Sequence, residues 1–94
     1  MTIKFSKVYQ LDLIDQVHYI YKDKPRAALK FRKDLIKNII KDLKHPFHFK
    51  ESIYSDGDKN IRDYVFKGYV SVYKIDSKQN SILVFGFIKY KNSF

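Results

Sequence analysis

The sequence predicts an α+β domain with the element order β-α-α-β-β-β, in which residues 1–94 form a single unit. Two observations lead to this fold class. Apolar side chains recur with helical spacing through residues 7–43, in two blocks separated by a short polar link. Residues 61–88 instead hold β-branched and aromatic runs separated by short turns, which is typical of strands. A chain of this length can bury one modest hydrophobic core.

The composition narrows the possible partners and surroundings. The formal net charge of +9 favours a polyanionic or acidic partner, such as nucleic acid, the ribosome or an acidic protein, although plain solubility is an alternative. The absence of cysteine excludes disulfides and thiolate metal sites and fits a reducing cytoplasm. No apolar stretch approaches the roughly 20 residues of a membrane span. We therefore expect a soluble cytoplasmic protein that makes no membrane contact.

A short strand over residues 2–5 and a first helix over residues 7–21 are expected at the N-terminus. Ser6 stands where a helix N-cap belongs. The apolar stripe of this helix is predicted to comprise Leu13, Val17 and Ile20, widened by Ile14 and Tyr21.

A second helix is predicted from Pro25 to Leu43, because proline is tolerated in the first turn and Asp23 can cap it. Its apolar side has two flanks, which comprise Ala28, Phe31, Leu35 and Ile39 on one and Ile36, Ile40 and Leu43 on the other. The short link between the helices predicts an antiparallel helical hairpin.

The opposite face of the second helix is basic along its whole length. Residues 22–44 hold nine basic and three acidic side chains, so six of the nine net charges fall here. The aligned cations, called the cationic stripe below, are Arg26, Lys30, Lys33, Lys37, Lys41 and Lys44. A one-signed stripe predicts binding to RNA, the ribosome or another partner, and an ordinary solvated face is the alternative of equal weight.

Residues 45–60 are predicted to be a loop. His45 and His48 stand three residues apart, but no third ligand follows at a suitable spacing, so no metal site is predicted. His48 and Glu51 are the loop side chains that could supply a catalytic base.

Residues 61–75 predict an antiparallel hairpin that turns at Lys67-Gly68. Alternation places Arg62, Tyr64 and Phe66 on one face of the first strand. After a polar turn at residues 76–80, the apolar run 81–88 predicts a strand covered on both faces, with a bulge or a close backbone approach at Gly86. The chain then ends in a basic and aromatic tail.

Taken together, these residues resemble the RelE/ParE superfamily of toxins from bacterial type II toxin–antitoxin modules. The resemblance extends over nearly the whole chain. Its matching pieces are Asp12-Leu13 with Tyr19-Ile20, the proline-opened helix with Ala27-Ala28, Leu43 followed by Pro46, Ile61-Arg62, Gly68-Tyr69 with Tyr73, and the apolar last strand with its basic end.

The resemblance implies an antiparallel sheet packed against the N-terminal helical hairpin. It also implies a cognate antitoxin as partner, in a hetero-oligomer, and no cofactor. RelE-like members cut messenger RNA in the ribosomal A site without a metal, whereas ParE-like members inhibit DNA gyrase. For RNA cleavage it implies catalytic roles for Arg62, Lys89, Tyr90 and Lys91, which would stabilise charge on the phosphorane and move protons.

The chain also departs from the RelE-like pattern. Val70 stands where those members often carry an arginine, and the histidine that some members have near the end of the last strand is absent. The sequence therefore favours a ribosome-dependent mRNA interferase, which is a metal-independent endoribonuclease. A gyrase inhibitor and a non-toxic relative that only binds antitoxin are the alternatives.

Overall fold

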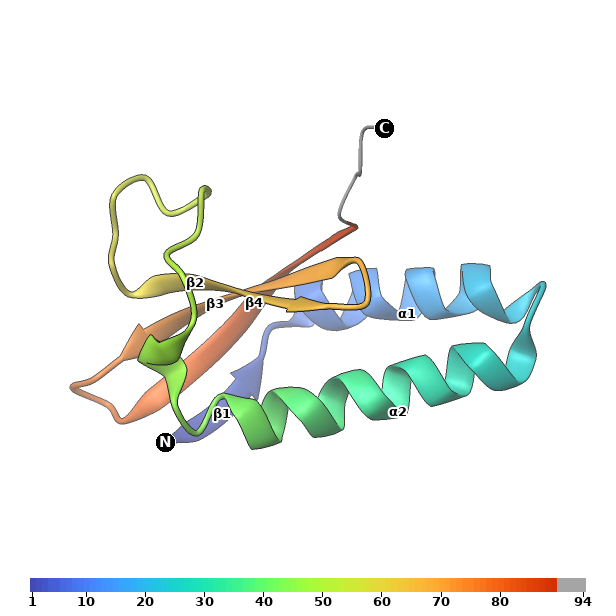
Figure 1. Cartoon of the computed structure of the whole chain (residues 1–94), viewed down its shortest axis with the longest axis horizontal. Coiled ribbons are helices and arrows are strands. Elements are labelled where there is room, and N and C mark those ends of the chain that lie inside the picture. Colours follow the sequence, from blue (N-terminus) through green and yellow to red (C-terminus); the bar gives the residue numbers. More distant parts are fainter. Residues whose placement is uncertain (90–94) are drawn as a thin grey trace.

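The computed structural model describes residues 1–89, and its element order is the predicted one (Figure 1). The elements are β1 (Thr2–Phe5), α1 (Lys7–Tyr21), α2 (Pro25–Asp42), a 3₁₀ turn (Pro46–His48), β2 (Ile61–Phe66), β3 (Tyr69–Asp76) and β4 (Ser81–Lys89). The α+β class and the packing of a sheet against a helical hairpin are confirmed. No helix within the described residues is long and apolar enough to span a bilayer.

The sheet has the strand order β1-β4-β3-β2. Strands β2, β3 and β4 are antiparallel to their neighbours, as predicted, but β1 runs parallel to β4 and makes the sheet mixed. Parallel pairing needs a long crossover. Here the helical hairpin and the β2–β3 hairpin lie between β1 and β4 in the chain and provide it.

Helix α1 begins as predicted, because the Ser6 side chain accepts a hydrogen bond of 3.0 Å from the Tyr9 amide. Leu13 is buried against the sheet, and so is Tyr9, whose hydroxyl lies 2.8 Å from that of Ser71 on β3. The prediction that Ile14 and Tyr21 widen the buried stripe is wrong. Their side chains are 52% and 46% exposed, because they face the gap between the helices on the side away from the sheet.

Helix α2 begins at Pro25, but its N-cap is Lys24 and no side chain caps it, so the predicted capping role of Asp23 is wrong. The predicted flank is confirmed as the buried one: Ala28, Phe31, Leu35 and Ile39 all face the core. On the second flank, Leu43 is buried and Ile40 is half exposed.

Two backbone details shape the strands. Lys67 and Gly68 both have positive φ angles, of 47° and 84°, which is the geometry of a two-residue hairpin turn. In β4, Gly86 pairs with Val72 and Val84 pairs with Tyr73, so Phe85 is an extra, bulged residue. A side chain at Gly86 would place its Cβ 3.1 Å from the Val72 Cβ. The predicted bulge and close approach therefore both occur here.

The two faces of the sheet are covered differently. Both helices pack on one face, where the hydrophobic core lies. The loop before β2 rises on the face away from α2 (Figure 1). It is joined to the edge of β2, since the Asp63 amide donates to the Lys50 carbonyl at 3.1 Å and the Ser52 amide donates to that of Ile61 at 2.9 Å.

Candidate functional site

Arg62, which was predicted to be catalytic, is bound to the loop that precedes β2. Its Nε donates to the Lys59 carbonyl at 3.0 Å, and its Nη1 donates to the carbonyls of Phe49 at 2.7 Å and Phe47 at 3.2 Å. The guanidinium carbon also lies 5.4 Å from the centroid of the Phe47 ring, a cation–π contact. The arginine therefore holds both ends of the loop together.

Lys89 lies far from Arg62. Arg62 pairs with Tyr73 in the middle of β3, whereas Lys89 pairs with Tyr69, the first residue of β3. The two β3 partners are four residues apart, which corresponds to about 13 Å along the strand. The structure therefore does not bring Arg62 and Lys89 into one site. The other two predicted catalytic residues, Tyr90 and Lys91, lie outside the described residues.

The cationic stripe is exposed along α2, as its sequence pattern predicts. One of its members is paired: the Lys30 ammonium lies 2.7 Å from the Asp34 carboxylate one turn later. This hydrogen bond lowers the pKa of Asp34. Because the pair is exposed to solvent and screened by salt, it contributes little to stability. The other five cations make no ion pair within residues 1–89 and present an uncompensated positive surface.

A hollow of about 680 Å³ lies on the face of the sheet opposite the helices. Side chains alternate along a strand, and those that reach the hollow from β2 and β3 are Asp63, Val65 and Val70. We call it the open-face hollow, and it is lined by Lys50, Ile53, Tyr54, Asp63, Val65, Val70, Ile88 and Lys89. Its volume is in the range of small-molecule and side-chain binding sites.

The electrostatics of the open-face hollow are unusual. Asp63 is 7% exposed, and its Oδ1 has no hydrogen-bond partner among the described residues. Lys50 and Lys89 are both exposed at the walls, yet neither pairs with it, since the ion pairs within residues 1–89 are Lys30–Asp34 and Lys74–Asp58.

Sequence reasoning missed Asp63 and Lys50. The available signal was a carboxylate in the middle of an apolar and aromatic strand.

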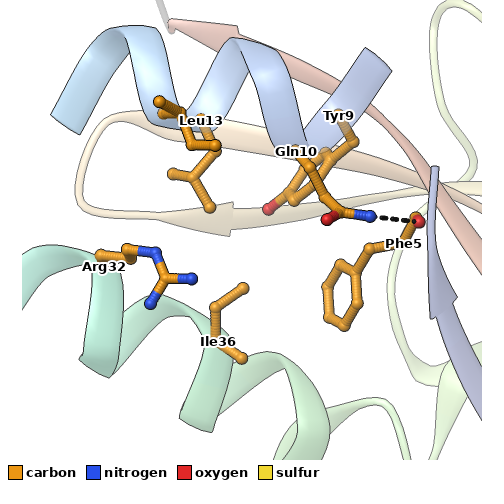
Figure 2. A pocket seen from close by; sticks show the side chains of 7 residues that line it. Phe5, Tyr9, Gln10, Leu13, Arg32 and Ile36 are labelled. Atoms are coloured by element: carbon orange, nitrogen blue, oxygen red, sulfur yellow. Dashed lines mark hydrogen bonds between the residues drawn. The ribbon is translucent and has the colours of Figure 1, made fainter. Parts of the chain in front are cut away.

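A second concave surface lies between the helices. Two adjoining pockets, of about 250 and 260 Å³, share Ile14 and Arg32 and form what we call the helical groove. Figure 2 shows Arg32 and Ile36 of α2 facing Leu13 of α1, with Phe5 at one end, where its carbonyl accepts a hydrogen bond of 2.9 Å from Gln10. The walls are mostly apolar, and Arg32 is the charged group among them.

The candidate loop bases lie away from the open-face hollow. His48 lines a separate, shallow site with Lys41, Asp42 and His45. Glu51 is exposed and forms an isolated β-bridge with Arg62. Within residues 1–89, no three His, Asp or Glu side chains gather in a way that could hold a metal ion.

Burial also keeps the core tyrosines neutral. The pKa values of Tyr64 and Tyr73 are raised well above 10, chiefly because burial disfavours the phenolate. The hydroxyl of Tyr64 also donates to Asp42 at 2.5 Å, which raises its pKa further. Neither phenol is a source of a base near neutral pH.

The architecture is that of a known class of small toxins. A chain of the chromosomal ParDE TA system from P. aeruginosa superposes with a TM-score of 0.74 at 16% sequence identity, covering 97% of each chain. The model of the family described as "ParE toxin of type II toxin-antitoxin system, parDE" matches residues 3–92. The chain belongs to this family. A comparison with curated protein sequences finds no match.

Proposed function

We propose that this type II toxin inhibits growth by binding DNA gyrase and carries out no chemistry of its own. The observation that supports this most is the engagement of Arg62 with three backbone carbonyls of the adjacent loop. An arginine that stabilises a phosphorane must offer its N–H groups to the phosphate in the transition state. For Arg62, the Nε and Nη1 donors are held by carbonyls of the loop, so only the Nη2 donors could face a phosphate unless these bonds broke.

Family membership supports the same target. The chain belongs to the ParE toxin family, and the resemblance drawn from the sequence connects ParE-like members with gyrase. Val70, where RelE-like members often carry an arginine, is buried and uncharged in this chain. The cytoplasm, where gyrase acts, is the compartment that this function requires.

The cationic stripe is the surface we assign to the protein target. It is exposed and one-signed, and all of it except Lys44 lies on α2, so it suits an acidic protein surface. The antitoxin is assigned to the helical groove in a hetero-oligomer, because an amphipathic segment would cover the apolar walls and bring a carboxylate to Arg32.

A second candidate function is metal-independent cleavage of mRNA on the ribosome. The observation that favours it is the position of Lys50, Tyr54 and Lys89 around one hollow, since RNA sites combine cations with aromatic side chains. In that case Lys89, with Tyr90 and Lys91 directly after it, carries the catalytic role, and Arg62 supports the loop.

A supercoiling assay with purified gyrase tests the first function. The full-length toxin is expected to inhibit supercoiling, and a variant with Lys33→Glu and Lys37→Glu in the stripe is expected to inhibit at least about tenfold less well. A variant with Lys4→Glu and Lys78→Glu, which are exposed and off the stripe, is the matched control and should act as the wild type. Undisturbed supercoiling at a large excess of toxin would reject gyrase as the target.

A further inference from the structure

Asp63 is a buried carboxylate whose Oδ1 has no hydrogen-bond partner within residues 1–89. The residue is 7% exposed and lines the open-face hollow. Burying a carboxylate without a partner has one of the largest free-energy costs of any group in a folded protein. Nothing in the core requires it, because the residues opposite it in β3 and β4 are Val72 and Gly86.

The walls of the hollow define what can reach this carboxylate. Ile53, Val65, Val70 and Ile88 are apolar, and Tyr54 offers an exposed aromatic face. A group that enters must therefore combine an apolar or planar body with N–H donors at its tip. A guanidinium on its three-carbon stem has this form, stacks on aromatic rings and is more weakly hydrated than an ammonium.

The two lysines at the walls restrict which residues of a partner can flank the entering group. Lys50 and Lys89 are exposed on opposite sides of the hollow, one from the loop and one from the end of β4. A uniformly basic segment would be repelled by them and by the overall charge of +9. In a segment where acidic residues flank an arginine, the guanidinium would instead pair with Asp63 and the flanking carboxylates would pair with the two lysines.

We infer that the open-face hollow is a receptor for an arginine side chain of the antitoxin, held by Asp63, with flanking acidic residues of the same segment on Lys50 and Lys89. This inference rests on the antitoxin partner of the proposed function and does not depend on whether gyrase or mRNA is the target.

The first test is an NMR titration of the ¹⁵N-labelled full-length chain with a capped Glu-Arg-Leu-Glu peptide. Saturable shifts are expected at the amides of Asp63, Val65, Val70 and Ile88. A peptide with citrulline in place of arginine, which keeps the shape and removes the charge, should bind at least about tenfold more weakly. Equal binding of the two peptides, or an absence of shifts at these four amides, would overturn the inference. Shifts there with guanosine monophosphate but not with the arginine peptide would overturn it in favour of a nucleotide site.

The second test uses Asp63→Asn, with Asp12→Asn as the matched control on the exposed face of α1. The amide removes an uncompensated charge, so Asp63→Asn should raise the Tm of the free toxin, by about 4 °C or more. The same substitution should weaken antitoxin binding on the order of tenfold or more, while Asp12→Asn changes neither quantity. A lower Tm would show that Asp63 is already paired within the chain, and unchanged antitoxin affinity would show that it binds nothing there. Either result contradicts the inference.

Discussion

The Arg62 guanidinium donates a hydrogen bond of 2.7 Å to the Phe49 carbonyl and so joins β2 to the chain that follows the 3₁₀ turn. The same group binds the carbonyl of Lys59 at the far end of the loop. One side chain thus closes a loop whose other residues form a wall of the open-face hollow. Arg62 shapes that hollow from outside, since it is not among the lining residues.

Arg62→Lys is expected to destabilise the fold. Lysine keeps the charge but cannot offer the planar fork that reaches several carbonyls at once. The expected loss is about 1–3 kcal/mol in the free energy of unfolding, measured by urea denaturation. Arg26→Lys, at an exposed position of α2, is the control and should be neutral. An Arg62→Lys protein of unchanged stability that has lost its toxicity would instead indicate that the guanidinium acts on the target.

Gly86→Ala is expected to destabilise the sheet. The new Cβ would lie 3.1 Å from the Cβ of Val72 on the adjacent strand, a tight contact that Val72 can relieve only by moving a few tenths of an ångström. Overpacking of this kind costs about 1–3 kcal/mol. The Val72→Ala background keeps the contact with the Cβ at position 72 but removes the methyl group that would lie 3.3 Å from the new Cβ. Gly86→Ala should therefore cost less stability in this background than in the wild type. A thermal melt of the four proteins measures this coupling, and additive effects would contradict it.

The buried tyrosines predict a loss of stability at high pH. The pKa values of Tyr9, Tyr64 and Tyr73 are raised, in each case chiefly by burial. A tyrosine whose pKa is higher in the folded than in the unfolded chain stabilises the fold fully at pH values below its unfolded-state pKa, near 10. This stabilisation is lost as the pH rises from there towards the pKa of the folded state. Three such groups give a slope of about 4 kcal/mol per pH unit above pH 10.

Absorbance at 295 nm, which reports phenolate formation, measures this effect. Of the eight tyrosines, these three should ionise only when the chain unfolds. Tyr64→Phe should remove one of the three late-titrating groups and reduce the slope of stability above pH 10 by a third. Ionisation of all eight tyrosines in one step near pH 10, with the fold intact, would contradict the account.

The cationic stripe predicts a conflict between stability and binding. Lys37 has Lys33 and Lys41 as like-charged neighbours four residues away on either side. Lys37→Glu turns both repulsions into attractions but also turns the attraction between Lys37 and Asp34 into a repulsion. The net result should be a gain of about 0.5 kcal/mol at low salt, with weaker inhibition of the target. Urea melts at 10 mM and 1 M salt provide the check, because the gain should disappear at high salt. A destabilised Lys37→Glu protein would show that the stripe is not under mutual repulsion.

The sequence predicts the fold well because the signals that determine it are local. Ser6, Pro25 and the Lys67-Gly68 turn each mark an element boundary by their own backbone chemistry, and the structure confirms all three. Ile14 and Tyr21 were assigned to the core wrongly, because periodicity identifies the apolar side of a helix but not how far the sheet extends beneath it.

The candidate site is harder to predict because it depends on tertiary contacts. The loop carbonyls that engage Arg62 come from positions up to fifteen residues away, so no pattern around Arg62 in the sequence indicates these contacts. Asp63 gains its significance from burial next to the loop, and residues 61–66 signal this only through a carboxylate in the middle of an apolar and aromatic strand.

The choice of target is the central claim, and primer extension on abundant messages from cells in which the toxin is induced tests it most directly. The gyrase proposal predicts messages without new cuts while growth stops and plasmids from the same cells lose negative supercoiling. Cuts inside translated codons, lost in Lys89→Ala and retained in Lys4→Ala, would contradict it and establish cleavage of mRNA instead.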